Sequence, residues 1–240
     1  MHAQVAADPG DRIDGMARVR LDAALVERGL FPTRARAQAA VLAGRVRVDG
    51  RPAAKPGSPV APAATLEVEA AEEFVSRGGR KLANALDALG VDVRGCLAVD
   101  VGASTGGFTD CLLRRGARRV AAVDVGYGQL DWRLRTDDRV HVMERVNARD
   151  LRPADLPFTP DLAVVDVSFI SVATVWPAVA ACMDPSGRAL VMVKPQFEVG
   201  RGQVGSGGVV RDPALRAGAV RGVADALAAS GWAPAGVADS

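Results

Sequence analysis

The 240-residue sequence is poor in the residue types on which metal and disulfide proteins depend: it has three cysteines and two histidines. Cys96, Cys111 and Cys182 are far apart and form no C-x-x-C pair, which excludes a disulfide framework and a zinc cluster. We expect each to be a small buried hydrophobic residue in a reducing compartment. His2 and His141 are too isolated to bind a metal, so we predict no metal site.

The sequence also lacks long hydrophobic runs. The longest uncharged run, Val167–Met183, has 17 residues with Pro177 inside it, whereas a membrane span needs about 20 apolar residues. We therefore predict a strand end and a helix there, and no membrane partner. Met1–Gly15 is acidic and polar, unlike a signal peptide. These absences predict a cytoplasmic protein.

The net charge is small, at +2, but the charged residues are unevenly distributed along the chain. Residues 18–57 contain nine Arg or Lys against three Asp or Glu, whereas residues 58–240 contain twenty against twenty-two. A basic segment joined to a near-neutral body predicts an anionic partner for the small part and chemistry in the large part. Charge alone fits a solvated basic surface equally well.

The first ordered pattern covers residues 18–69, between a predicted disordered extension at 1–17 and a predicted linker at 70–76. Met16 is a candidate start, because the pattern begins directly after it. The expected elements are a helix that stops at Gly29, a helix over Arg34–Ala43 capped by Thr33, a hairpin over Arg45–Arg51 and a strand over Thr65–Val68.

Three segments of this pattern resemble an S4-type RNA-binding domain: Arg20-Leu-Asp22, Thr33-Arg-Ala-Arg-Ala37 and Gly44-Arg-Val-Arg-Val-Asp-Gly50. The resemblance implies that the domain holds structured RNA by shape and phosphate contacts. The predicted RNA contacts are seven basic side chains expected to project outward here and two more just before the next helix: Arg20, Arg34, Arg36, Arg45, Arg47, Arg51, Lys55, Arg77 and Arg80.

A glycine-rich turn organises the rest of the chain. Leu97–Val101 has the length and apolarity of a strand, Gly102, Gly106 and Gly107 follow it, and Asp110–Arg115 is typical of a helix. Strand, glycine turn and helix form a geometry in which backbone N–H groups and a helix N-terminus face a ligand. Glycines allow the main chain to approach that ligand closely.

Two acidic strand ends favour S-adenosylmethionine (SAM) as the ligand. Asp100 precedes the turn, where it would repel a phosphate and attract a cationic group such as the SAM amino group. Asp124 ends the next strand, where it can accept both hydroxyls of a ribose. The glycine spacing differs from the G-x-G-x-x-G of a dinucleotide site. A nicotinamide site and a bare structural turn are the alternatives.

Strands and helices then alternate, which predicts a doubly wound, mostly parallel sheet with right-handed crossovers. The expected fold class is α/β: a Rossmann-like SAM-dependent methyltransferase domain over 77–240, preceded by the small α+β domain over 18–69. Expected strands are Val120–Asp124, Val140–Met143, Leu162–Asp166 and Ala189–Val193, and expected helices are 82–89, 110–115, 172–183 and 213–229.

Two charged residues end apolar strands of this predicted sheet. Asp166 and Lys194 are costly there unless they are paired, so we expect them to contact each other. Lys81, at the start of the helix before the first strand, could reach the same opening. A lysine there can take a proton from an alcohol, or steer its lone pair, while a methyl group moves in line to oxygen. A purely structural ion pair is the alternative.

Seven segments in order resemble the TlyA (hemolysin A) family of ribosomal RNA ribose 2′-O-methyltransferases, an S4 domain followed by an FtsJ-like methyltransferase domain. They are 74–82, 100–108, 122–130, 147–150, 166–171, 193–198 and 207–213. The resemblance implies catalysis by Lys81, Asp166 and Lys194. It implies SAM contacts by Asp100, Gly102, Ala103, Ser104, Thr105, Gly106, Gly107, Phe108, Asp124, Asn147 and Asp150. The implied substrate is cytidine in 16S ribosomal RNA, 23S ribosomal RNA or both. The sequence itself gives no indication of an obligate protein partner.

One departure from the family affects the expected activity. The family has a fourth catalytic residue, a glutamate on a strand beyond where this sequence stops, so we expect an open edge on the fifth strand, marginal stability and impaired methyl transfer. An RNA-binding or ribosome-assembly factor without catalysis is the alternative. A membrane-lytic role has no amphipathic or spanning segment to support it.

Overall fold

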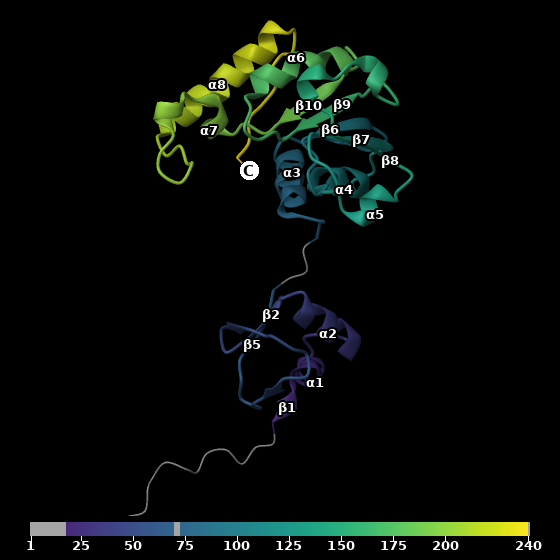
Figure 1. Ribbon diagram of the computed structural model, residues 1–240, viewed down its shortest axis with the longest axis vertical. Helices are drawn as coiled ribbons and strands as arrows, with labels where there is room; N and C mark the ends of the chain where they lie inside the picture. Colours follow the sequence, from purple (N-terminus) through teal and green to yellow (C-terminus); the bar gives the residue numbers. More distant parts are fainter. Residues whose placement is uncertain (1–17, 70–72, 240) are drawn as a thin grey trace, which may run out of the picture. The chain divides into compact units, whose positions relative to one another are not determined.

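A computed structural model describes residues 18–69 and 73–239 (Figure 1). The chain separates into two compact units, residues 1–71 and 72–240. The predicted extension at 1–17 and residues 70–72 of the predicted linker lie outside the described residues. Within the described ranges, no helix is long and apolar enough to cross a membrane.

The N-terminal unit combines two helices with short antiparallel strands. Its elements are β1 (Val19–Arg20), α1 (Leu21–Glu27), α2 (Arg34–Leu42), β2 (Val46–Val48), β3 (Arg51–Pro52), β4 (Pro59–Val60) and β5 (Leu66–Val68). β1 pairs with β4, and β2 lies between β3 and β5. The two helices and the strands bury one core around Leu21, Leu25, Val41 and Val46.

Local sequence explains most of this unit. The Thr33 hydroxyl accepts a hydrogen bond from the backbone N–H of Arg36 (3.3 Å), which confirms the predicted helix cap. Asp49 and Gly50 both have positive φ and connect β2 to β3, which confirms the hairpin. The β1–β4 pair was not predicted, because Pro52–Pro62 was expected to be loop; Val19 pairs there with Val60.

The C-terminal unit contains one parallel five-stranded sheet in the order β10-β9-β6-β7-β8. The strands are β6 (Leu97–Val101), β7 (Arg119–Asp124), β8 (Val140–Glu144), β9 (Leu162–Val165) and β10 (Arg188–Val191). The helices are α3 (Arg77–Ala88), α4 (Gly107–Arg114), α5 (Trp132–Arg135), α6 (Val172–Cys182), α7 (Pro195–Glu198) and α8 (Pro213–Ala229), with 3₁₀ turns at 148–150, 153–155 and 201–203. The predicted doubly wound parallel sheet is confirmed.

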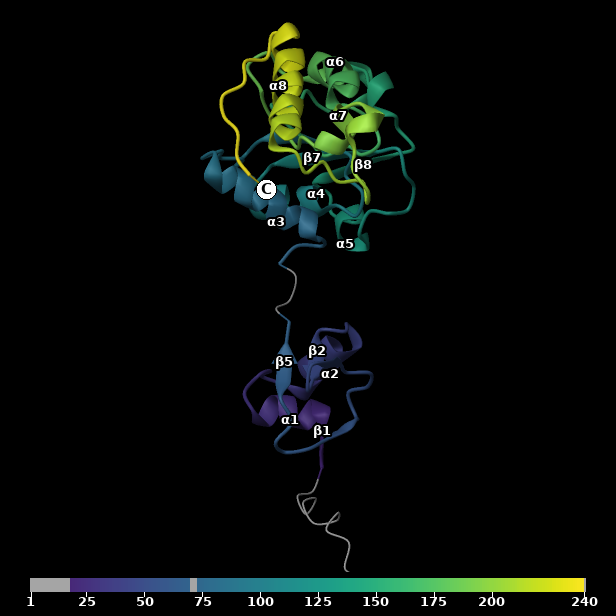
Figure 2. The same ribbon diagram turned by 90° about the vertical axis from the view of Figure 1, so that its left-hand side faces the viewer.

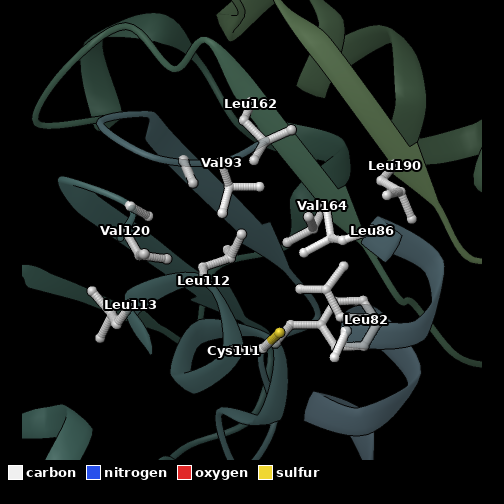
Figure 3. Close-up of a cluster of buried hydrophobic side chains, with 14 of the residues drawn as sticks. Leu82, Leu86, Val93, Cys111, Leu112, Leu113, Val120, Leu162, Val164 and Leu190 are labelled. Carbon is white, nitrogen blue, oxygen red and sulfur yellow. The ribbon is translucent and has the colours of Figure 1, made fainter. Parts of the chain in front are cut away.

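Helices cover both faces of this sheet: α3 and α4 lie on one face, and α6 and α8 on the other (Figures 1 and 2). Figure 3 shows the first core, in which Leu82 and Leu86 of α3 meet Leu112 of α4 and Val164 of β9. The opposite core is centred on Trp176, whose ring meets Trp232 edge-on at 5.1 Å.

The strand order positions a site. The direction of winding reverses between β6 and β9, and ligands of such sheets bind at the carboxyl ends of the strands near this point. Among the described residues β10 pairs only with β9, so no strand pairs with its outer edge.

Candidate active site

The glycine turn between β6 and α4 adopts backbone conformations that only glycine adopts readily. Gly102 has φ +88° and Gly106 φ +93°. The N–H groups of Gly102 and Ala103 donate to the carbonyl oxygen of Val123 (2.8 and 3.1 Å), which ties the turn to β7. A Cβ on Gly102 would lie 2.7 Å from the carbonyl oxygen of Asp166. The turn therefore lies directly against the end of β9.

The Asp124 carboxylate joins the turn to the loop after β7. It accepts hydrogen bonds from the backbone N–H groups of Ser104 (2.8 Å) and Gly126 (2.6 Å). Each carboxylate oxygen has a second lone pair, so it can still accept a ligand hydroxyl. A small cavity beside it is lined by Ala103, Ser104, Ala122, Asp124, Gly126, Gln129, Leu130, Val142 and Glu144.

Asp100 is fully buried behind the turn. The Thr109 hydroxyl donates to its Oδ2 (2.7 Å), whereas its Oδ1 has no hydrogen-bond partner among the described residues. The pKa of Asp100 is raised to about 7, chiefly by burial. The Thr109 hydrogen bonds oppose this rise, and the negative charges of Asp166 and Asp124 contribute to it. The buried carboxyl thus offers one unused acceptor next to the turn.

Replacing Asp100 with Asn should remove a pH dependence of stability. The pKa of Asp100 is about 7 in the folded protein and about 3.9 in an unfolded chain. Between about pH 4 and pH 7 the Asp100 carboxyl is protonated in the folded protein and ionised in the unfolded chain. The free energy of unfolding therefore falls as pH rises through this range. The fall should be about 4 kcal/mol larger in the wild type than in Asp100→Asn. Urea melts at several pH values measure it, and parallel curves for the two proteins would contradict it.

The loop after β8 lies beside the loop after β7. The backbone N–H groups of Arg145 and Val146 donate to the carbonyl oxygens of Gly126 and Asp124, both at 3.0 Å. Asn147 follows, and its Oδ1 accepts the N–H of Arg149 (3.1 Å) at the start of a 3₁₀ turn. Asn147 and Asp150 are exposed at this edge. Their contact with adenine stays a prediction.

Asp166 and Lys194 meet at the ends of β9 and β10. Lys194 Nζ lies 2.6 Å from Asp166 Oδ1, and the two side chains are 21% and 20% exposed. The predicted contact is confirmed. Lys194 also donates a hydrogen bond to Ser168 Oγ at 2.8 Å. Lys194 is the N-cap of α7, directly before Pro195.

Lys81 lies on the exposed face of α3, next to the buried Leu82. The start of α3 packs against the glycine turn, because a Cβ on Gly78 would lie 3.6 Å from the Phe108 ring. Lys81 thus borders the same region, but no ion pair or hydrogen bond within 73–239 joins it to Asp166 or Lys194. Arg77, which begins α3, and Arg80 are exposed beside it.

One aromatic residue at this edge was not predicted. Phe169 is 91% exposed and has φ +64°, a conformation rare for a side chain of this size. Its ring lies 5.2 Å from that of Phe197, at 48°. The sequence does contain a signal for Phe169: this apolar residue directly follows Asp166-Val-Ser168, where the chain leaves the sheet.

In the N-terminal unit, Arg20 and Arg34 bind Asp22 rather than projecting freely. The buried carboxylate of Asp22 accepts two hydrogen bonds from Arg20 (3.1 and 2.9 Å), two from Arg34 (both 3.2 Å) and one from Gln38 (2.7 Å). These bonds, first that of Arg20, hold the pKa of Asp22 far below its usual value.

The other predicted RNA contacts of this unit differ in how they are bound. Arg47 forms a loose ion pair with Glu69 (3.4 Å). Arg36, Arg51 and Lys55 are exposed, Arg45 is half-buried, and none of the four has an ion pair or side-chain hydrogen bond within the described part of the chain. These cations are available to an anionic ligand.

Comparison with known proteins identifies the family. A family model for FtsJ-like methyltransferases matches residues 74–240, and one for S4 domains matches residues 19–66. The chain is 52% identical over 222 residues to the 16S/23S rRNA (cytidine-2′-O)-methyltransferase TlyA of Mycobacterium tuberculosis, covering 92% of this chain and 83% of the relative. It is 46% identical over 217 residues to YqxC of Bacillus subtilis, provisionally named an rRNA methyltransferase, covering 89% and 76%.

A solved structure agrees. A protein of Streptococcus thermophilus that is provisionally named a hemolysin is 40% identical, with a TM-score of 0.65 over 88% of this chain and 80% of that one. The chain therefore belongs to the TlyA (hemolysin A) family of FtsJ-like methyltransferases, in which an S4 domain precedes the catalytic domain.

Proposed function

We propose that this enzyme transfers the methyl group of SAM to a ribose 2′-hydroxyl of ribosomal RNA, at cytidine in the 16S or 23S molecule. The observation that carries the proposal is the Asp166–Lys194 ion pair (2.6 Å) at the same sheet edge as the glycine turn. A relative that covers most of the chain is named for this reaction. Such a substrate implies a cytoplasmic protein.

Several residues of the site fit SAM. The turn at 102–108 would hold it together with Asp124, Asn147 and Asp150, and the unpaired Oδ1 of buried Asp100 is an acceptor suited to a cationic group. When bound, SAM supplies an electrophilic methyl group on a sulfonium. The protein's own task is to align the accepting hydroxyl with it and to manage the hydroxyl proton.

The ion pair suits that task. The Asp166 carboxylate holds the Lys194 ammonium at the strand ends. A neutral lysine would take the hydroxyl proton as the methyl group is transferred. An ammonium would instead donate a hydrogen bond to the 2′-oxygen and turn its remaining lone pair toward the methyl group, and the hydroxyl proton would then pass to solvent. Lys81, on the neighbouring α3, is the second cation of the proposed site. The exposed ring of Phe169 is a surface on which the target base can stack.

The N-terminal unit would hold ribosomal RNA through phosphate contacts. Replacing Arg51 and Lys55 together with Ala should weaken binding to ribosomal subunits and reduce the slope of log affinity against log salt by about 2, because each lost phosphate contact removes about 1. Binding titrations over a range of KCl concentrations measure this slope. Arg94→Ala, which removes an arginine paired with Asp92 in the other unit, is the control and should leave it unchanged. Equal slopes for all three proteins would contradict the assignment.

Transfer of tritiated methyl from SAM to purified small and large ribosomal subunits tests the function, followed by mapping of the modified nucleotide. We expect label in RNA at a ribose 2′-oxygen of cytidine. SAM binding without transfer would instead support the alternative, an RNA-binding or assembly factor of the same fold. Label on a base, or on protein, would overturn the proposal.

A further inference from the structure

Lys194 makes two contacts, and only the contact with Ser168 has the geometry of a hydrogen bond, because Asp166 Oδ1 has no hydrogen-bond partner among the described residues. Its Nζ lies 2.6 Å from Asp166 Oδ1 as an ion pair. Its hydrogen bond goes to Ser168 Oγ at 2.8 Å. Coulomb attraction fixes a distance but not the direction of an N–H bond, whereas a hydrogen bond requires the N–H to point at its acceptor.

We infer that Ser168 is a positioning residue: its hydroxyl fixes the rotation of the Lys194 ammonium, so that the remaining N–H groups are directed at the substrate hydroxyl. This inference rests on the proposed function of the Asp166–Lys194 pair.

The loop after β9 positions the Ser168 hydroxyl next to Lys194. The Asp166 N–H donates to the carbonyl oxygen of Val101 (2.9 Å), which fixes the start of the loop to β6. Val167 is buried, so the side chains on either side of it emerge on the same side as the ammonium. Phe169 then turns the chain away with φ +64°. Asp166 and Ser168 thus reach Lys194 from one short, anchored segment.

The backbone of Lys194 is fixed at the start of α7, and its side chain extends from there to the loop after β9. A lysine side chain has four rotatable bonds, and holding it in one orientation costs conformational entropy. Two contacts from a rigid loop offset this cost before the substrate arrives. Because Ser168 is exposed, its hydroxyl hydrogen stays available and a larger side chain fits at the position.

Three variants test the inference: Ser168→Ala, which removes the acceptor; Ser168→Thr, which keeps it; and Ser230→Ala, which removes an exposed hydroxyl at the end of α8 as a matched control. We expect Ser168→Ala to lower kcat by about 10- to 100-fold, with the SAM dissociation constant and the KM for ribosomal subunits changed less than about twofold. Ser168→Thr should recover most of the loss, and Ser230→Ala should equal the wild type. A wild-type kcat for Ser168→Ala, a change confined to KM, or failure of Thr to recover the rate would each overturn the inference.

Two further readouts separate positioning from folding and from the proposed function. In a Lys194→Met background, Ser168→Ala should change kcat by less than about twofold, because there is no ammonium left to orient. In the protein without SAM or RNA, NMR of the Lys194 ammonium should show proton exchange with water that is faster in Ser168→Ala than in the wild type. Equal exchange in the two proteins would refute the inference even if the wild type methylates ribose. Faster exchange in Ser168→Ala, together with no methyl transfer by the wild type, would refute the proposed function alone.

Discussion

Lys194→Met should lower kcat for methyl transfer to ribosomal subunits by about 10²- to 10⁴-fold, the usual contribution of a positioned proton-handling group. The methionine has a similar length and no ammonium, so the site loses the group that contacts Asp166 and Ser168. The glycine turn and Asp124 are untouched, and the SAM dissociation constant should therefore stay within about twofold. Steady-state kinetics and calorimetric SAM titration measure both quantities.

The control is Lys55→Met, which removes an exposed lysine of the N-terminal unit. It should raise KM for ribosomal subunits and leave kcat unchanged, because its predicted role is phosphate binding rather than chemistry. If Lys194→Met retained the wild-type kcat, the ion pair at the strand ends would be a structural feature, and the alternative of a non-catalytic RNA-binding factor would gain support.

Gly102→Ala should both destabilise the protein and lower its activity. At φ +88° an alanine is strained by about 1–2 kcal/mol. Its Cβ would also lie 2.7 Å from the carbonyl oxygen of Asp166, which is backbone and cannot rotate away. The end of β9 must shift, and the Asp166 carboxylate shifts with it. We expect a total loss of about 3 kcal/mol in the free energy of unfolding, together with weaker SAM binding.

Gly90→Ala is the matched control, because Gly90 has φ +62° and a Cβ there would meet no atom of the described residues within 4 Å. An alanine there has a positive φ but no collision, and we expect it to lower the free energy of unfolding by about 1 kcal/mol and to leave activity unchanged. Denaturant unfolding of the two variants isolates the effect of the close approach. Equal destabilisation would show that the turn and β9 are not tightly packed.

The contact between the charged residues at the strand ends was predictable from sequence, because a charge in a mostly buried position needs a partner of opposite sign. Asp166 and Lys194 follow runs that must lie inside the sheet, so each required a partner of opposite sign, and the parallel topology placed both at one edge. The alternation of strands and helices likewise predicted the layered fold. The same reasoning could not predict where the Lys81 side chain lies, because nothing on α3 restricts an exposed lysine.

The predicted start of α3 was wrong by five residues for an identifiable reason. Gly78 and Gly79 disfavour helix locally, so the helix was expected only from Leu82. In the structure, however, α3 begins at Arg77. A Cβ on Gly79 would lie 2.3 Å from Phe74, so the glycine permits Phe74 to pack into the core. Tertiary packing overrides local propensity there.

Contacts between distant segments could not be predicted from local patterns either. Arg20 and Arg34 share the buried carboxylate of Asp22, but only the packing of α1 against α2 brings the second arginine to it. A strand of two residues, such as β1, has no periodicity to detect. Phe169 was hidden because its exposure depends on a left-handed turn at a non-glycine residue.

A double-mutant cycle tests most directly whether Asp166 and Lys194 act as one unit. The single-turnover rate of methyl transfer would be measured for Asp166→Asn, Lys194→Met and the double variant. If Asp166 acts through Lys194, adding Asp166→Asn to Lys194→Met changes the rate by less than about twofold. A double variant whose rate falls by the product of the two single effects would contradict the account.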